Sequence, residues 1–286
     1  MAGLKSLLRS LELERVDDGQ YRAPNAQGPG SVVFGGQLLA QSIIAARLDH
    51  PGKEVKTVHT IFARGGSPAV DVEIDVDVMH TGRAFGSSTV TIRQGDRLCT
   101  RSLLLLSAEE DDLIRHADEM PDVGSPEDAR AGGGMDEWEV RIVDGVDIAD
   151  PDAVGPPQLD VWTRFAGAPT GDSGLAQALV AYATDPFLIA TAMRPHAGVG
   201  QAQAHVTLST GVVSHTLTFH EAVDAGEWLL LSHHSPYAGH GRSYGRANIF
   251  QNGTLVASFV QDNMIRPLPE GHRRAGDTPA NVARSR

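Results

Sequence analysis

The chain has 286 residues, of which 41% are apolar and 21% are charged, so it is long enough for two domains and can bury a core. This composition excludes a disordered chain, a collagen-like chain and a small disulfide-bonded scaffold. The single cysteine, Cys99, excludes an internal disulfide and a cysteine-rich zinc site, and it predicts a reducing compartment. Neither an apolar run of about 18 residues nor a secretory signal is recognisable, so we expect a soluble, cytoplasmic protein.

The net charge of −12 comes from one segment. Residues 109–152 contain 16 acidic and 3 basic residues, a local charge of −13, so the rest of the chain sums to about +1. We therefore expect no nucleic-acid partner, because no basic stripe is present. The prolines and glycines of this acidic segment are typical of a linker. The predicted organisation is a first unit at 1–108, an acidic linker at 109–134, a second unit at 135–268 and a mobile tail at 269–286.

The first unit begins with leucines at helical spacing and a short hairpin, followed by a longer helix and then by strands. Alternation of valine or isoleucine with acidic residues from Val70 to Val78 predicts a strand with one face in water. The predicted elements are a helix over Leu4–Leu11, a turn at Asp17–Gly19, a helix over Gly35–Ala46, and strands over Val70–Val78, Ser87–Arg93 and Leu98–Ser107.

The second unit repeats this order. Asn252-Gly253 is a strong signal for a hairpin between its last two strands. The predicted elements are a strand and turn over Trp138–Gly145, a strand over Leu159–Phe165, a helix over Gly174–Thr184, and strands over His205–Phe219, Glu227–Ser232, Ser243–Phe250 and Leu255–Ile265.

Residues also recur between the two units. His59-Thr60 matches His215-Thr216 at an offset of 156, and Gly82–Gly86 matches Gly241–Gly245 at an offset of 159. Leu98 matches Leu255 at an offset of 157, which makes Leu104 the counterpart of Gln261. Similar motifs in the same order indicate an internal duplication. The predicted fold class is α+β, in which one helix is covered by an antiparallel sheet and this unit is made twice.

Several motifs together resemble the type II acyl-CoA thioesterases (TesB-like). The most specific is Leu255–Gln261, which reads Leu-Val-Ala-Ser-Phe-Val-Gln, and the matches extend from about Val33 to Arg266. The other motifs are Val33–Gln37, Val58–Thr60 with Phe62, Gly82–Phe85, Arg194–His196, Ser214-His215 with Phe219-His220, Glu227–Leu230 and Gly241-Arg242.

The resemblance implies a double hotdog fold and hydrolysis of fatty acyl-CoA to free fatty acid and CoA. It also implies a catalytic Asp, Gln and Ser or Thr that together hold a water molecule. Asp185 stands at the family's Asp and Gln261 at its Gln. The family's hydroxyl position holds Val212, and Ser214 stands where the family often has an Asp. Thr210, Val212 and Ser214 are predicted to share one face of a strand, so we expect a neighbouring hydroxyl to compensate for Val212.

Each site residue has a structural alternative. Asp185 precedes Pro186, and this pair is typical of an N-cap and the first position of a helix. Gln261 is alternatively a satisfied structural amide. Gly36 and Gln37, at the start of a helix, are predicted with Ser214 to contact the substrate through exposed amides or side chains. Close packing explains the small residues there equally well.

Other motifs are assigned structural roles. Ser243 lies in a Gly-x-Ser-x-Gly sequence, but a strand follows it rather than the helix that a serine hydrolase requires. His233, His234 and His240 lack the accompanying ligands of a metal site, so we expect neither a metal nor a cofactor. His59 and His215 recur in both units, which favours a structural role. Cys99 is predicted to lie in the core.

The leading hypothesis is an acyl-CoA thioesterase in which Asp185 activates a water molecule and Gln261 orients it. Arg64, Arg194 and Arg242 are candidates for contacts with the phosphates of CoA. Two alternatives remain open: a hotdog enoyl-CoA hydratase, and an acyl-CoA binding protein whose catalytic set has decayed at Val212. The family resemblance also implies a homo-oligomer.

Overall fold

A computed structural model describes residues 3–28 and 30–268, so the predicted mobile tail at 269–286 lies outside it. Within these ranges the helices are α1 (Leu4–Ser10), α2 (Gly35–Leu48), α3 (Ser173–Thr184) and α4 (Leu188–Met193), with short 3-10 turns at Val143–Gly145 and Gln201–Gln203. The strands are β1 (Glu14–Asp17), β2 (Gln20–Ala23), β3 (Glu54–Phe62), β4 (Val72–Thr81), β5 (Phe85–Gln94), β6 (Arg97–Ser107), β7 (Arg130–Met135), β8 (Trp138–Ile142), β9 (Gln158–Phe165), β10 (Leu208–Phe219), β11 (Leu229–Gly239), β12 (Arg242–Gln251) and β13 (Thr254–Pro267).

These strands form one sheet in the order β1-β2-β4-β5-β6-β3-β10-β13-β12-β11-β9-β8-β7, and each neighbouring pair is antiparallel. Strands β3 and β10 pair at the centre. On the side of β3 the sheet continues through β6, β5 and β4, and on the side of β10 it continues through β13, β12 and β11. The two halves therefore share one topology, as the internal duplication predicts.

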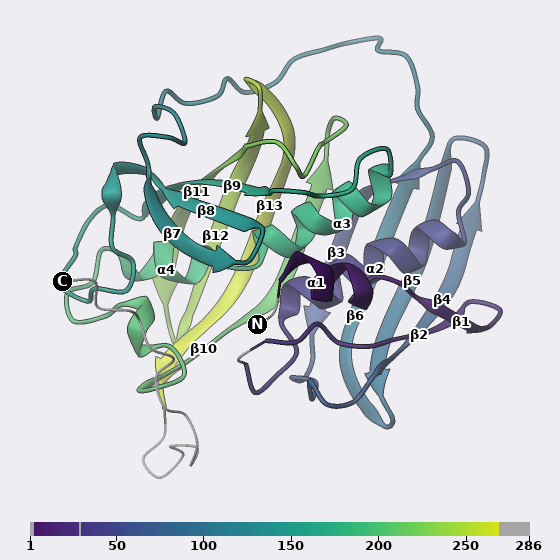
Figure 1. The fold of residues 1–286 in the computed structure, drawn as a ribbon, viewed down its shortest axis with the longest axis horizontal. Coiled ribbons are helices and arrows are strands. Elements are labelled where there is room, and N and C mark those ends of the chain that lie inside the picture. The colour runs from purple at the N-terminus through teal and green to yellow at the C-terminus, as the bar shows by residue number, and fades with distance from the viewer. Residues whose placement is uncertain (1–2, 29, 269–286) are drawn as a thin grey trace.

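Helices α2 and α3 lie side by side within the curve of the sheet (Figure 1). Gly36 in the first turn of α2 contacts Tyr182 near the end of α3, and Arg47 at the end of α2 contacts Gly174 at the start of α3, so the helices are antiparallel. A Cβ atom at Gly36 would lie 2.6 Å from the carbonyl oxygen of Tyr182. Only glycine permits this approach, and one apolar core connects both halves.

A β-bulge occurs at the same place in both units, which are called the first and second copies below. The register of β3 against β6 shifts between Val55 and Thr57, and the register of β10 against β13 shifts between Val212 and Ser214. Equating Val55 with Val212 gives an offset of 157 (212 minus 55), which is the spacing predicted from Leu98 and Leu255. The two copies therefore match in register, bulge included.

The repeated His-Thr dipeptide does not mark equivalent positions. His59 pairs with Thr216, and Thr60 pairs with His215 across the centre of the sheet. His215 and Thr60 are fully buried, whereas His59 is half-buried on the other face, where its Nδ1 lies 2.7 Å from Thr216 Oγ1. His59 and His215 are therefore not counterparts, and their recurrence is no evidence for a shared role, because an offset of 156 reverses the face on which a strand residue lies.

Most predicted elements are present. Strands β3 and β7 and helix α4 were not predicted, and β7 (Arg130–Met135) begins inside the predicted linker at 109–134. Strand β4 extends beyond the alternating segment to Thr81. Strand β10 begins at Leu208 rather than at His205, whose backbone is left-handed with φ at 61°. The segment Ser173–Met193 is long and apolar enough to cross a membrane by length and composition alone. It consists of α3 and α4, and 78% of its most apolar window is buried inside the structure.

Candidate active site

Asp185 directly follows α3 and faces the first turn of α2. Its side chain is 8% exposed, and its carboxylate accepts a hydrogen bond from the Gly36 N–H. A Cβ atom at Gly35 would lie 2.9 Å from Asp185 Oδ1, so the small residues that begin α2 let the carboxylate approach. The first amides of a helix favour negative charge, and α2 therefore stabilises this carboxylate in part.

Asp185 does not cap the helix that follows it, so the structural alternative for this residue is wrong. Its φ and ψ of −67° and −42° are helical, and it closes α3. Helix α4 begins at Leu188 after Phe187, whose backbone is left-handed with φ at 83°. Phe187 therefore separates the two helices, and the carboxylate is directed to α2 instead of to α4.

Burial raises the pKa of Asp185 to about 7, against the smaller opposing effect of the Gly36 hydrogen bond. The carboxylate also lies at the C-terminal end of α3, where the helix carries partial negative charge. Its Oδ1 is buried and has no hydrogen-bond partner in the part of the chain that the structure describes. Such a carboxylate is poised to accept a proton near neutral pH.

Gln261 on β13 is fully buried beside the end of α3. Its Nε2 lies 3.0 Å from the carbonyl oxygen of Thr184, 3.2 Å from that of Asp185 and 2.9 Å from His215 Nδ1. Its Oε1 is buried without a partner among residues 3–28 and 30–268. The nitrogen is thus committed to the protein, and only the amide oxygen is free to orient a water molecule.

His215 is a site residue that the sequence analysis missed. Thr184 Oγ1 donates to the Ala181 carbonyl at 2.7 Å, so it accepts a hydrogen bond from His215 Nε2 at 3.2 Å. This contact leaves His215 Nδ1 as the acceptor for Gln261. Burial, with a smaller effect of His59, lowers the pKa of His215 to about 3. The neutral ring therefore fixes the orientation of the Gln261 amide.

The same strand pair is apolar in the first copy. His215 pairs with Gln261 in the second copy, and Val58 pairs with Leu104 at the corresponding positions of the first. Val58 and Leu104 are 0% and 2% exposed. The register thus agrees with the predicted correspondence of Leu104 and Gln261. Counting by the offset of 157 would also have singled out His215, through its replacement of a valine.

The remaining predicted contacts are placed differently. Gln37 is buried, and its amide binds the N–H of Ala26 at 2.9 Å and Asn25 Oδ1 at 2.8 Å, so it anchors the loop after β2. Gly36 gives its N–H to Asp185 and serves helix packing. Neither residue presents the free polar group that was predicted for substrate binding.

Ser214 lies on the outer face of the sheet, where its hydroxyl donates to Asp262 Oδ2 at 2.8 Å. Its neighbour His215 faces inward and is fully buried. Of the three residues predicted to share one face, Thr210 and Val212 do so, and Thr210 is buried, whereas Ser214 does not, because the bulge inserts Val213 without a partner on β13. Ser214 is therefore not brought to Asp185 and does not replace the hydroxyl missing at Val212.

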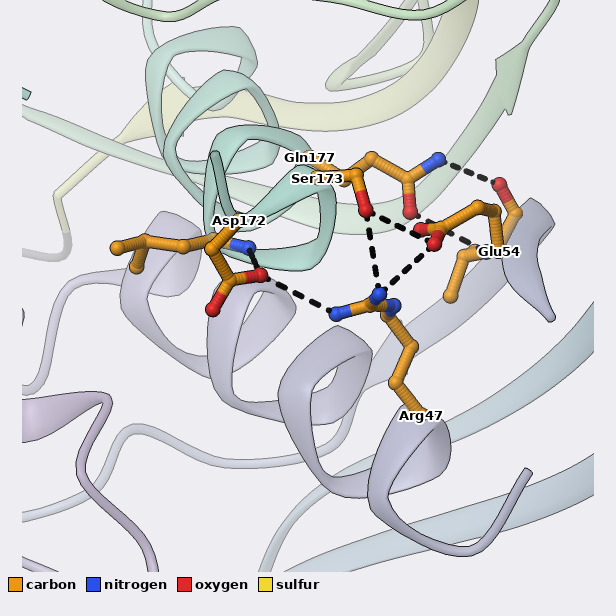
Figure 2. A network of polar contacts seen from close by, with 7 residues as sticks. Arg47, Glu54, Asp172, Ser173 and Gln177 are labelled. Carbon is orange, nitrogen blue, oxygen red and sulfur yellow. Dashed lines mark hydrogen bonds and ion pairs between the residues drawn. The ribbon is translucent and has the colours of Figure 1, made fainter. Parts of the chain in front are cut away.

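The first copy has an ion-pair network at the position where the second copy has its site (Figure 2). Arg47 at the end of α2 contacts Glu54 Oε1 at 2.8 Å and Asp172 Oδ1, at the start of α3, at 3.4 Å. A Cβ atom at Gly174 would overlap the guanidinium group, so Arg47 fills the space at the start of α3. Asp49, which closes α2, accepts instead from a tyrosine hydroxyl at 3.0 Å. The duplicated fold is thus asymmetric.

A cavity of about 250 Å³ lies at the end of α4 that is remote from Asp185. Of the three arginines predicted to contact CoA, Arg242 lines this cavity, whereas Arg194 donates to the carbonyl oxygen of Gln158. Arg64 lies at an exposed position after β3. The other lining residues of the cavity are Ala192, Met193, His196, Val199, Ala238, Gly239, Gly241 and Ile265.

Of the residues that were assigned structural roles, Ser243, His233 and Cys99 are buried, whereas His234 is half-buried and His240 is exposed. Ser243 lies within β12 and is 1% exposed, and its hydroxyl contacts Asn263 Nδ2 at 3.4 Å. His233 contacts the Leu159 carbonyl oxygen at 2.9 Å, and burial lowers its pKa to about 4. Cys99 is a buried free thiol. Among the described residues, no group of three or more histidines, cysteines or carboxylates is arranged to hold a metal ion.

The fold is a double hotdog, in which one duplicated antiparallel sheet encloses two helices. It has one candidate site, where a buried Asp and a buried Gln lie at the end of the second helix. Family models agree with this class. The acyl-CoA thioesterase N-terminal domain matches residues 23–107, and the acyl-CoA thioesterase C-terminal domain matches residues 116–265. The chain therefore belongs to the acyl-CoA thioesterase family.

Individual relatives span almost the whole chain. Acyl-CoA thioesterase 2 of Haemophilus influenzae is 27% identical over 92% of this chain and 98% of its own length. Mouse acyl-coenzyme A thioesterase 8 is 26% identical over 91% of this chain and 88% of its own length. The structure of acyl-CoA thioesterase II TesB2 from Mycobacterium marinum is 28% identical with a TM-score of 0.78 and covers 93% of this chain and 99% of its own. A tesB protein of Mycobacterium avium is 26% identical with a TM-score of 0.79, covering 93% and 100%.

Proposed function

We propose that the chain hydrolyses fatty acyl-CoA to a free acid and CoA by direct attack of water on the thioester carbonyl. The observation that carries this proposal is the pair of buried oxygens, Asp185 Oδ1 and Gln261 Oε1, that lack a partner within the described chain. A water molecule has two O–H donors, and these two acceptors would hold it beside the first turn of α2. Membership of the acyl-CoA thioesterase family supports the choice of substrate.

The chemistry needs only one base. Asp185 accepts a proton from water as the new C–O bond forms, and the tetrahedral intermediate then breaks its C–S bond. The leaving thiolate has a conjugate acid with a pKa of roughly 8.5, so it departs without prior protonation. The proton on Asp185 passes to solvent or to the thiolate, which restores the base. A carboxyl with a pKa of about 7 performs both steps near neutral pH.

His215 is assigned a positioning role. Its Nδ1 accepts from the Gln261 amide nitrogen, and that contact directs Gln261 Oε1 toward the water. We expect His215→Asn, whose amide oxygen can accept in place of Nδ1, to retain more activity than His215→Leu. The pH profile of kcat/KM is expected to keep the pKa of Asp185 in both variants.

The enoyl-CoA hydratase alternative requires an acid–base pair across a double bond. His215 contacts Gln261, but both of its ring nitrogens are engaged and its pKa is about 3. It is thus neutral and unavailable as a proton donor. The binding-protein alternative is distinguished by tight binding of acyl-CoA with no release of thiol above the rate in buffer.

The deciding experiment measures free thiol from a panel of acyl-CoAs of graded chain length. We expect turnover by the natural chain and a loss of at least 100-fold in Asp185→Asn. A single turnover in H₂¹⁸O then separates two mechanisms. Direct attack places ¹⁸O in the released acid, whereas hydrolysis of an acyl-Asp185 anhydride at its aspartyl carbonyl places ¹⁸O in Asp185. Thiol release equal to that in buffer would remove the proposal.

We further propose a cytoplasmic location and a homo-oligomer. The buried free thiol of Cys99 is compatible with a reducing compartment. The end strands of the sheet, β1 and β7, have one open edge each, which is a common route to association between copies. Light scattering after size exclusion measures the mass, and a value of one chain at micromolar concentration would contradict the oligomer.

A further inference from the structure

Asn263 is a second buried amide on the inner face of β13, two residues beyond Gln261. It is fully buried, and its Oδ1 has no hydrogen-bond partner among the residues that the structure describes. Its Nδ2 makes one long contact, 3.4 Å, to the buried hydroxyl of Ser243. Residues i and i+2 of a strand share a face about 7 Å apart, so Asn263 extends the polar surface that Gln261 begins.

The strand register places Asn263 directly across from Val212. Val212 occupies the position at which the family resemblance implies a Ser or Thr. Both residues lie on the inner face and on the same side of the bulge, whereas Ser214 on the other side of the bulge faces outward. A polar group at Asn263 therefore enters the site from the strand next to the missing hydroxyl.

The first copy supplies an internal comparison. The corresponding pair is Val55 and Leu106, which are 1% and 0% exposed. Along this face the first copy has Leu104 and Leu106, and the second has Gln261 and Asn263. A buried amide oxygen without a partner costs about 1–3 kcal/mol, whereas leucine at the same place packs without that cost. The amide is therefore retained for something other than packing.

Two donors beside Asp185 and Gln261 are already engaged and are not free for the oxyanion. The Gly36 N–H is given to Asp185, and the Gln261 nitrogen is given to the helix end and His215. Because a hydroxyl both donates and accepts, Ser243 can hold the Asn263 amide in either orientation. When Ser243 donates to Oδ1, the buried oxygen gains its partner and the amide N–H groups face the site.

We propose that Asn263 is a catalytic residue that donates a hydrogen bond to the thioester carbonyl oxygen as it becomes an oxyanion, in place of a hydroxyl at Val212. This assignment rests on the proposed hydrolysis. Asn263 forms no covalent bond and transfers no proton. Ser243 is its positioning residue, which gives the Gly-x-Ser-x-Gly sequence a role other than that of a nucleophile.

The test compares Asn263→Leu with Asn263→Ala in thiol release from acyl-CoA. Loss of one oxyanion donor is expected to lower kcat by about 10²–10³-fold with little change in KM. Because leucine fills the corresponding place in the first copy, Asn263→Leu is expected to fold with unchanged or raised Tm. Higher stability combined with lost turnover is a signature that a structural amide would not give. Asn248→Ala is the matched control, since its amide contacts Asp118 at 3.1 Å on the exposed face of β12.

Rescue makes the assignment specific. Val212→Thr in the Asn263→Ala background places a hydroxyl on the paired strand, and we expect it to restore kcat at least tenfold. Ser243→Ala is expected to lower kcat less than Asn263→Ala. Any of three results would overturn the role of Asn263. These are full kcat in a folded Asn263→Ala or Asn263→Leu chain, a change confined to KM, and failure of Val212→Thr to restore kcat. Absence of thiol release from the natural chain would instead overturn the proposed hydrolysis.

Discussion

The raised pKa of Asp185 predicts that activity rises with pH while the stability of the fold falls. The variant Asp185→Asn tests this prediction. Burial raises this pKa from 3.8 to about 7, so the folded chain binds the proton more tightly than the unfolded chain does. A carboxyl of this kind stabilises the fold fully below pH 3.8, and that contribution is lost as the pH rises through 7. Each pH unit well inside this interval is worth about 1.4 kcal/mol, so the loss from pH 5 to pH 8.5 is about 2.7 kcal/mol, of which about 2.3 kcal/mol occurs below pH 7.

The neutral amide of Asp185→Asn has no such dependence. We expect the free energy of unfolding of the variant, relative to the natural chain, to rise by about 2.7 kcal/mol from pH 5 to pH 8.5, mostly below pH 7, and to level off above about pH 8. The buried histidines His215 and His233 have lowered pKa values, and their opposite pH dependence is common to both proteins. Burial, reinforced by Asp185, raises the pKa of Tyr182 to about 12, so it is neutral throughout the range. The difference between the two curves therefore isolates Asp185.

Urea denaturation at intervals from pH 5 to pH 8.5 measures these curves, and thiol release measures kcat/KM over the same range. The natural chain is expected to gain kcat/KM with unit slope up to about pH 7 and to reach a plateau above it. Asp49→Asn is the control, because Asp49 closes α2 as Asp185 closes α3. Parallel stability curves for the natural chain and Asp185→Asn would refute the reasoning, since they would mean that the buried carboxyl titrates normally.

Three further predictions concern the asymmetry of the copies. Gln261→Leu is expected to fold but to lose about 100-fold in kcat, which thiol release measures. The reciprocal Leu104→Gln buries an unpartnered amide and is expected to lower the free energy of unfolding by about 2 kcal/mol, which calorimetry measures. Gly36→Ala brings a Cβ atom to 2.6 Å from a carbonyl oxygen, so a loss of about 3 kcal/mol is expected, against less than about 0.5 kcal/mol for Gly28→Ala, whose Cβ would have no neighbour within 4 Å. Arg47→Met removes the ion pairs of Figure 2 and is expected to lower the free energy of unfolding by about 1 kcal/mol, less at high salt, with kcat unchanged. A fall in kcat equal to that of Gln261→Leu would contradict the assignment of chemistry to the second copy alone.

Much of the fold was predictable because its signals are local. Alternating patterns, the Asn252-Gly253 turn and the duplicated order gave the sheets and both long helices. Strand β3 was missed because its bulge at residue 56 breaks the alternation of apolar and polar residues that identifies a strand. The Asp185-Pro186 pair indicated a helix start close to α4, but no range was assigned to that helix, and a left-handed Phe187 delays its start to Leu188.

The site was predictable only in part. Asp185 and Gln261 were assigned through resemblance to the family, and the structure brings Gln261 Nε2 to 3.2 Å from the carbonyl oxygen of Asp185. The face of each residue on β10 was not predictable, because counting by two from Ser214 passes through the bulge and assigns the wrong side. His215 and Asn263 were missed for another reason. The offset of 157 was applied to Gln261 but not to Val58 and Leu106, whose counterparts are His215 and Asn263.

Duplication explains how one chain tolerates these buried polar groups. In a pair of identical units both copies would carry the site, and each would bear the cost of its unpartnered oxygens, about 1–3 kcal/mol per group. In the fused chain the first copy has Val58, Leu104 and Leu106 at the corresponding positions, all buried, and Arg47 closes the opposite end of the helix pair. The copies share one core across β3 and β10, so apolar packing in the first stabilises the fold in which the second holds its base. Gene fusion thereby allows a stabilising copy and a chemical copy to diverge within one sheet.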